Sequence, residues 1–210
     1  QLLRRWGYPS HPPQQLVGRL GLARGRQHDA HEALLALLDR TPMGPPGRLL
    51  SVVRCGATGE TSTVPEPFHV LSLPLAPTVE AALERQDVLR GAEVWHSPSA
   101  AAQHLTPTCS YKHLTVAQLP PSGVVVHWKR FDNRGHKRSD EVEVLPYWRG
   151  YSLAAAVLHH GRSGQGGHYT AVVREGSTWY ACDDSHITSL GPSWPRQLRQ
   201  AYLLLYLPGQ

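Results

Sequence analysis

The stretch Gly166–Asp184 reads GGHYTAVVREGSTWYACDD and decides the fold, because it predicts a β-hairpin. Two runs rich in β-branched and aromatic residues, 169–174 and 178–182, flank a turn centred near Gly176. Antiparallel pairing around that turn sets residues whose numbers sum to about 352 opposite one another. The residues just outside the two runs are therefore expected to meet at the open end of the hairpin.

Side chains that can hold and move a proton lie at that open end. His168 falls across from Asp183 and Asp184, and an imidazole beside a carboxylate is the base-and-orienter half of a nucleophilic triad. The preceding loop, 161–167, has four glycines in seven residues, which lets backbone approach a substrate chain closely. The alternative is structural: His168 caps a strand and the two aspartates make a turn. The hairpin supplies no nucleophile.

Upstream of the hairpin the pattern changes from helical to β. Apolar residues recur at helical spacing over 27–40 and predict an amphipathic helix, which three prolines and two glycines in 41–48 end. Segment 78–90 has a weaker helical pattern, and 95–108 is ambiguous. Besides the two runs of the hairpin, strands of mostly antiparallel sheets are predicted at 49–54, 68–73, 124–128 and 201–207.

Composition excludes several classes of protein. No uncharged apolar run approaches the roughly 18 residues that a membrane span needs, so a membrane is not an expected partner. The formal net charge of +5 comes from 21 scattered Lys and Arg, so nucleic acid is not expected either. Three widely spaced cysteines do not form a disulfide pattern, and Gln1–Trp6 shows no signal segment. We expect an intracellular protein of the cytoplasm, the nucleus or both.

Four segments, in order along nearly the whole chain, resemble the motifs of the ubiquitin-specific proteases. The hairpin, together with AYLLLY at 201–206, resembles the family's histidine box. QHDAHE at 27–32 resembles its glutamine- and aspartate-containing helix motif, and FHVLSLPL at 68–75 resembles its central strand. The run from LPP at 119–121 to VHWKRF at 126–131 resembles its Lys-Arg-Phe strand. Their ordered co-occurrence argues against chance.

The resemblance implies a fold and an activity. The fold is α+β, a papain-like cysteine peptidase of the thumb-fingers-palm type with an incomplete thumb and antiparallel β fingers and palm. Residues 1–210 then form a partial catalytic domain: 1–45 the remaining helical thumb, 46–120 the fingers and connecting region, and 121–210 the palm with the histidine box. The activity is that of a deubiquitinase, the thiol-dependent hydrolysis of (iso)peptide bonds after the C-terminal Gly of ubiquitin.

Roles carry over by position. His168 is the general base, Asp183 orients it, and Asp184 assists or substitutes. Asp29 and Glu32 lie three apart on one helix face, which in the family meets the basic tail of ubiquitin. An ordinary solvated helix face is the alternative for both. The substrate-binding set implied by the resemblance is Gln27, Asp29, Glu32, Gly166, Gly167 and Tyr169.

The family's cysteine box, which carries the nucleophile, is not within the 210 residues. Cys182 lies inside a strand next to Asp183, whose charge raises a thiol pKa, so it is interpreted as a small buried hydrophobe. Cys109 falls in a variable stretch and Cys55 at a former metal position. None is expected to be catalytic.

A structural zinc is not expected in the fingers. Many family members bind zinc there with two Cys-x-x-Cys pairs. Here CGAT at 55–58 and SPSA at 97–100 keep one ligand of four. The pair His28 and His31 and the neighbours 159–160 lack a second cluster at metal spacing, so surface or core histidines are the interpretation. We predict no metal and no other cofactor.

Two hypotheses from different classes remain. The first is an enzyme whose cysteine is supplied upstream of residue 1, so that this chain alone is inactive. The second is a non-catalytic ubiquitin-binding or scaffolding pseudoprotease. We favour the enzyme, because a decaying pseudoenzyme has little chemical reason to keep His168 with two adjacent aspartates. The expected partners are ubiquitin or ubiquitinated proteins, and the protein is expected to be a monomer. A third hypothesis, nucleic-acid binding, is supported only by the net charge and ranks far behind.

Overall fold

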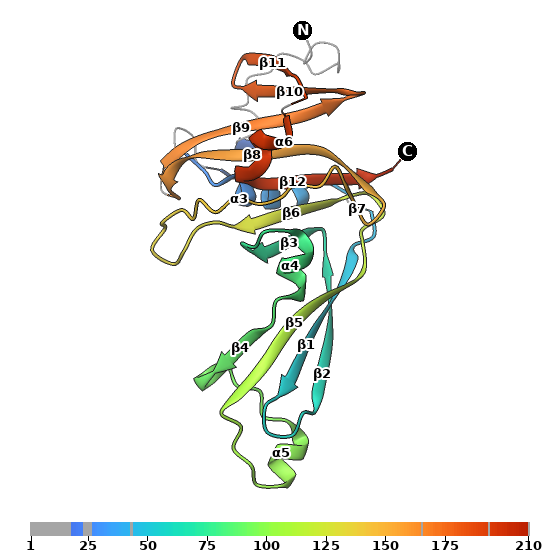
Figure 1. Cartoon of the computed structure of the whole chain (residues 1–210), viewed down its shortest axis with the longest axis vertical. Helices are drawn as coiled ribbons and strands as arrows, with labels where there is room; N and C mark the ends of the chain where they lie inside the picture. Colours follow the sequence, from blue (N-terminus) through green and yellow to red (C-terminus); the bar gives the residue numbers. More distant parts are fainter. Residues whose placement is uncertain (1–17, 23–26, 43, 165, 193, 210) are drawn as a thin grey trace.

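The structure is a computed structural model that describes residues 18–22, 27–42, 44–164, 166–192 and 194–209. The predicted absence of a signal segment at Gln1–Trp6 concerns residues outside these ranges. Over the described ranges the chain forms two β-sheets with short helices beside them (Figure 1). In the part that the structure describes, no helix has both the length and the apolar character needed to cross a membrane.

The smaller sheet has four strands in the order β2-β1-β5-β4. It extends away from the rest of the molecule, with α5 at its far tip (Figure 1). All its neighbouring strands pair antiparallel. Its elements are β1 (Gly47–Cys55), β2 (Thr61–Phe68), β4 (Asp87–Arg90), β5 (Cys109–Gln118), the 3-10 turn η1 (Gly91–Glu93) and α5 (Pro98–Ala102).

The larger sheet has the order β11-β10-β9-β8-β12-β6-β3, with β7 paired to β8. Its pairs are antiparallel except for β3 with β6, which are parallel. Its strands are β3 (Val70–Pro74), β6 (Val124–Lys129), β7 (Tyr147–Trp148), β8 (Tyr151–Ser163), β9 (Gly166–Glu175), β10 (Thr178–Asp183), β11 (His186–Leu190) and β12 (Ala201–Pro208). The remaining helical elements are α3 (Ala30–Leu38), α4 (Val79–Glu84), α6 (Trp194–Gln197) and η2 (Leu198–Gln200). The predicted α+β class with mostly antiparallel sheets is confirmed.

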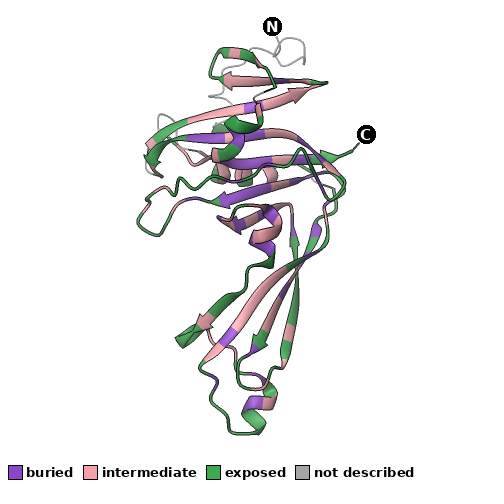
Figure 2. Ribbon diagram, in the orientation of Figure 1, coloured by how far each residue is buried: buried purple, intermediate pink, exposed green. Residues whose placement is uncertain are grey.

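The core lies along the larger sheet, where Figure 2 shows most of the buried residues. The side chains of Val124, Val126 and Trp128 alternate along β6 and are at most 1% exposed, as are those of Leu204 and Tyr206 on the adjacent β12. Strand side chains alternate between faces, so this spacing directs one face of the pair into the core. Each large apolar side chain buried in this way stabilises the fold by about 1.5–3 kcal/mol.

Arg130 ties the end of β6 to its surroundings. Its guanidinium is fully buried and donates hydrogen bonds to backbone carbonyls, at 2.7 Å to Ala201, 2.8 Å to Asp140 and 3.1 Å to Arg199. Burial lowers its pKa to about 10. The middle residue of the Lys-Arg-Phe motif is therefore a structural cross-link between three segments of the chain.

Most predicted elements are confirmed, with three corrections. The helix predicted at 27–40 begins only at Ala30. The strand predicted at 68–73 is broken between β2 and β3. The helical pattern of 78–90 holds for Val79–Glu84 alone, because 87–90 pairs with β5 as an edge strand, a contact that local sequence does not encode.

The hairpin differs from its predicted register by one. Its ladder runs from Glu175 opposite Thr178 to Ala171 opposite Cys182, so paired numbers sum to 353. The turn has two residues, and its first, Gly176, has a φ of +59° that suits glycine. Segment 161–167 is also not an open loop, because β8 extends to 163 and β9 begins at 166.

Candidate active site

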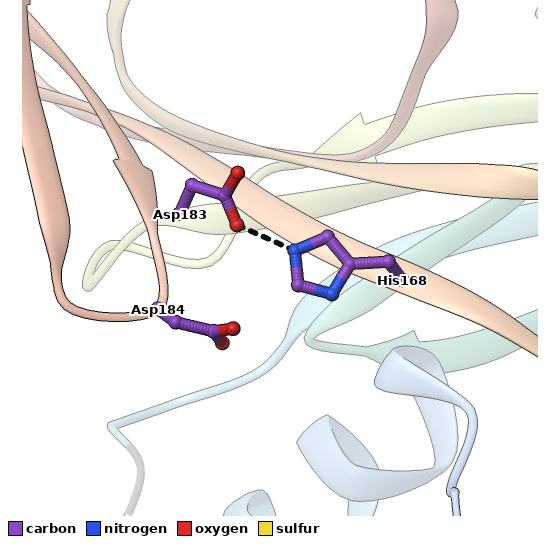
Figure 3. A group of neighbouring side chains, drawn as sticks. All are labelled: His168, Asp183 and Asp184. Atoms are coloured by element: carbon purple, nitrogen blue, oxygen red, sulfur yellow. Dashed lines mark hydrogen bonds and ion pairs between the residues drawn. The ribbon is translucent and has the colours of Figure 1, made fainter.

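The structure brings His168 and Asp183 together. His168 lies near the start of β9 and Asp183 at the end of β10, and 2.5 Å separates the imidazole Nε2 from Asp183 Oδ1 (Figure 3). Extending the hairpin register by one pair sets Asp183 opposite Thr170. His168, two residues before Thr170, is then a diagonal neighbour on the same face of the sheet. The predicted pair therefore meets diagonally rather than directly across.

The electrostatics of this pair make the imidazole a stronger base. The hydrogen bond to Asp183 raises the pKa of His168 above its ordinary value, and the charges of Asp183 and Asp184 add to the effect. The two side chains are 47% and 60% exposed, so solvent reaches the pair. In the described chain no hydrogen-bond partner contacts Nδ1, and this nitrogen is left to receive a proton from another group.

Asp184 occupies the turn between β10 and β11 with a φ of +48°, a conformation that Asp tolerates better than most residues. Its carboxylate points toward the His168 ring without a hydrogen bond to it (Figure 3). His168, Asp183 and Asp184 each have a side-chain nitrogen or oxygen within 4.8 Å of such an atom in the other two residues. This spacing suits the binding of a cation as well as the transfer of a proton. Because Nε2 is already bound to Asp183, we assign the group to proton transfer.

Asp29 is an anchor inside the site rather than part of an exposed helix face. As the N-cap of α3, its Oδ1 accepts hydrogen bonds from the backbone N–H of His31 at 2.8 Å and of Glu32 at 3.1 Å. Its Oδ2 accepts from the hydroxyls of Tyr202 at 2.8 Å and Tyr169 at 3.0 Å. The predicted face shared with Glu32 is therefore wrong for Asp29, whereas Glu32 stays exposed.

The hydrogen bonds keep the Asp29 carboxylate charged. Burial raises its pKa, but the hydrogen bonds from Tyr202, the backbone of Glu32 and Tyr169 outweigh burial, so the net pKa is lowered. Burial, together with the neighbouring Asp29 carboxylate, raises the pKa of both tyrosines. The network therefore joins α3, β9 and β12 through one ionised acid and two neutral phenols.

Five of the six predicted substrate-binding residues gather beside this network. Gln27 bonds the backbone of Gly167, and the hydroxyl of Tyr169 bonds Asp29. Together with Gly166 they line a small cavity of about 30 Å³. Glu32 is not among its lining residues.

Two buried histidines lie beneath the site. The sequence predicts surface or core histidines for the pair 159–160 and assigns no role to His127. His127 is 7% exposed, stacks on His31 with ring centroids 3.7 Å apart, and lies 3.0 Å through Nδ1 from the Ser72 hydroxyl. Burial lowers its pKa to about 4. His159 is 3% exposed and contacts the ring of Tyr169, with centroids 4.8 Å apart. Both occupy the strands beneath the site, a place that only the three-dimensional pairing reveals.

The cysteines lie away from His168. Cys182 follows the alternation of β10 onto the face opposite Asp183, and burial raises its pKa. Cys55 is fully buried at the end of β1 in the smaller sheet, and Cys109 pairs with Arg90 in that sheet. Burial raises the Cys55 pKa, but hydrogen bonds outweigh it and lower the value to about 6. These cysteines are therefore excluded as partners of His168 and Asp183 by their position in the fold and not by the pKa of their thiols.

The two segments compared above with zinc-binding pairs, 55–58 and 97–100, do meet. Thr58 Oγ1 and Ser97 Oγ form a hydrogen bond of 2.9 Å, and the Ser97 side chain also caps α5. Thr58 and Ser97 are also among the groups that lower the pKa of the neighbouring Cys55 thiol. A cluster of hydroxyls and one thiol therefore joins the tip of β1 to the start of α5.

The family model described as ubiquitin carboxyl-terminal hydrolase matches residues 15–206. The chain belongs to this family. Among curated members, it is 28% identical to ubiquitin carboxyl-terminal hydrolase 23 of Arabidopsis thaliana, over 93% of this chain and 28% of that protein. It is 29% identical to the probable ubiquitin carboxyl-terminal hydrolase 3 of Schizosaccharomyces pombe, over 72% of this chain and 34% of that protein. The chain thus spans about a third or less of these two hydrolases.

Solved structures show the same fold. One is a chain of the SAGA Ubp8/Sgf11/Sus1/Sgf73 module bound to monoubiquitin, with a TM-score of 0.69 at 24% identity over 94% of this chain and 52% of that one. A second is the module bound to ubiquitin aldehyde, with a TM-score of 0.69 at 23% identity over 90% and 51% of the two chains. The expected ubiquitin-specific protease fold is confirmed, and the chain spans about half the length of each of these solved chains.

Proposed function

We propose that this chain contributes the general base and its orienting carboxylate to a deubiquitinase, which hydrolyses (iso)peptide bonds after the C-terminal glycine of ubiquitin. The observation that carries the proposal is the bond of 2.5 Å from His168 Nε2 to Asp183, which leaves Nδ1 to face a nucleophile. Membership of the hydrolase family supports the reaction class. The nucleophile in this proposal is a cysteine outside the 210 residues.

The proposed chemistry follows from these positions. His168 Nδ1 takes the thiol proton, and the thiolate attacks the carbonyl carbon of the last ubiquitin glycine. The imidazolium, held by Asp183, then gives its proton to the leaving amine as the C–N bond breaks and a thioester forms. A water molecule attacks the thioester after losing a proton to His168, which releases the ubiquitin carboxylate and restores the thiol.

The proposed substrate groove passes the small cavity between α3 and β9. Two glycines, Gly166 and Gly167, line it, so backbone of an incoming chain can lie close to backbone of the protein. A tail that ends in Gly-Gly fits such a narrow passage, because it brings no side chains of its own. The exposed carboxylate of Glu32 is available to a basic residue preceding those glycines. Ubiquitin is accordingly the proposed partner.

A ubiquitin derivative with a C-terminal electrophile tests the proposal. The reagent is added to a full-length polypeptide that contains this chain, and the mass increase of one ubiquitin is measured. We expect a covalent adduct on a cysteine, formed about 10²–10⁴ times more slowly by His168→Ala. The matched control is His104→Asn, an exposed position with a φ of +53° in the smaller sheet's connection. No adduct from the unmodified polypeptide would reject the enzyme.

A binding module without catalysis is the second candidate. It is favoured by the hydroxyl cluster of Thr58 and Ser97, which stands where many family members place metal ligands. The coding sequence before residue 1 separates the two: a Gly-Asn-x-x-Cys-like segment favours the enzyme, and an initiator Met close to Gln1 favours the binding module. Ubiquitin binding without adduct formation would support the second candidate.

A further inference from the structure

The backbone just before His168 is hydrogen-bonded by a side chain that lies far away in the sequence. Gln27, just before α3, donates from Nε2 to the carbonyl of Gly167 at 3.0 Å. In return, the Gly167 N–H donates to Gln27 Oε1 at 3.1 Å. This exchange of two bonds copies the pairing between residues of neighbouring antiparallel strands. The carboxamide thus acts as one extra rung beside β9.

His159 closes the opposite side of the same segment. A Cβ built on Gly167 would lie 2.3 Å from His159 Nε2 and 2.4 Å from the carbonyl of His160, so only glycine fits there. Since the His159 side chain is 3% exposed and packed against Tyr169, it cannot move aside to make room for a Cβ at position 167. The segment is therefore confined between a carboxamide and a buried imidazole.

This confinement matters because the His168 side chain has little other support, although its backbone pairs with His160 in the β8–β9 ladder. The His168 side chain is 47% exposed, and its bond to Asp183 is the one hydrogen bond that its ring makes within the described ranges. Gly166 pairs with Ser163, but the β8–β9 register shifts between His160 and Ser163, so Gly167 has no partner in that ladder and would otherwise have wide backbone freedom. A displacement of about 1 Å at a catalytic group can lower a rate about 100-fold.

We propose that Gln27 is a positioning residue for His168: with His159 as the opposing wall, it holds residues 166–167 so that the imidazole stays at Asp183. The catalytic consequence rests on the proposed deubiquitinase function, whereas the effect on His168 itself does not. The proposal differs from a role for Gln27 as a ligand of the ubiquitin tail. The nitrogen and the oxygen of its carboxamide each bond Gly167 already, so a tail could use only the second N–H and the second oxygen lone pair.

The first test follows the His168 imidazole by NMR titration in the chain itself. The variant Gln27→Met keeps the side-chain length and loses both hydrogen bonds, and Gln27→Ala removes the side chain. Both are expected to lower the pKa of His168 toward its ordinary value, because the imidazole leaves Asp183 for part of the time. The matched control is Gln86→Ala, an exposed residue between α4 and β4. An unchanged His168 titration in Gln27→Met would overturn the proposal.

The second test separates positioning from substrate binding in the polypeptide that carries the nucleophile. Gln27→Met is expected to lower kcat about ten- to a hundredfold while KM for a ubiquitin substrate changes less than about twofold. A raised KM with an unchanged kcat would instead identify Gln27 as a tail ligand and reject positioning. If no adduct forms with the electrophile while the His168 pKa still responds to Gln27→Met, the proposed function fails and the positioning role stands.

Discussion

Acidification should destabilise the chain through His127, a buried imidazole beneath the site. His127 is 7% exposed and lies between the ring of His31, stacked at 3.7 Å, and the edge of Tyr202 at 4.9 Å. Burial, followed by the like charge of His31, lowers its pKa from 6.5 to about 4. The native state therefore holds this ring neutral, whereas the unfolded chain protonates it near its ordinary value.

The size and sign of the effect follow from this difference. Each pKa unit corresponds to about 1.4 kcal/mol, so a difference of roughly 2.5 units amounts to about 3 kcal/mol. Because the pKa of His127 is depressed in the folded state, the contribution is fully present above about pH 6.5 and is lost as the pH falls toward 4. Burial also lowers the pKa of His31 and His159, which act in the same direction. The raised pKa of His168 acts in the opposite direction.

The assay is urea unfolding followed by tryptophan fluorescence at several pH values between 7 and 4. The perturbation is His127→Phe, which keeps an aromatic ring and removes the titrating group. The variant loses the hydrogen bond to Ser72, a cost of about 1 kcal/mol at every pH. Its loss of stability between pH 6.5 and 4 should be smaller than that of the unmodified chain by about 3 kcal/mol.

The matched control is again His104→Asn, which leaves the buried ring pair untouched. Parallel pH curves for the unmodified chain and His127→Phe would refute the reasoning, because they would show that the buried ring does not set the acid limit. A larger acid loss in His127→Phe would be equally incompatible with it.

Two further predictions concern the carboxylates of the site. Asp29→Asn should lower the free energy of unfolding by about 1–3 kcal/mol in urea melts, because charge-assisted hydrogen bonds to Tyr169 and Tyr202 are lost; a change below about 0.5 kcal/mol would contradict the anchor role. Asp183→Asn should lower kcat of the nucleophile-bearing polypeptide by at least about 100-fold, and Asp184→Asn by less, since only Asp183 bonds the imidazole; the reverse order would assign the orienting role to Asp184.

The sequence identified the hairpin because alternation and turn chemistry are local signals. Its register was one off because the turn has two residues and was centred on Gly176. The inward position of Asp29 also had a local signal: an acidic residue followed by Glu32 three positions later is typical of a helix start. The interpretation of Asp29 and Glu32 as one exposed helix face overlooked this signal.

Other features had no local signal. The contact of Gln27 with Gly167 and the hydroxyl bonds of Tyr202 join residues at least 140 positions apart. Edge strand β4 exists because β5 offers it a partner, although its sequence continues a helical pattern. Periodicity reports which face a residue occupies, and it does not report which distant strand lies across that face.

The position of β12 has a consequence for biosynthesis. This strand is the last of the larger sheet to leave the ribosome, yet it lies between β8 and β6 near the middle of that sheet. Until it emerges, no strand joins the hairpin with His168 to the pair β3–β6. The backbone edges of β8 and β6 are then free to pair with other chains. These edges stay exposed to association with other chains until residues 201–208 have been made, and a loss of those residues would leave the two parts of the larger sheet without the strand that joins them.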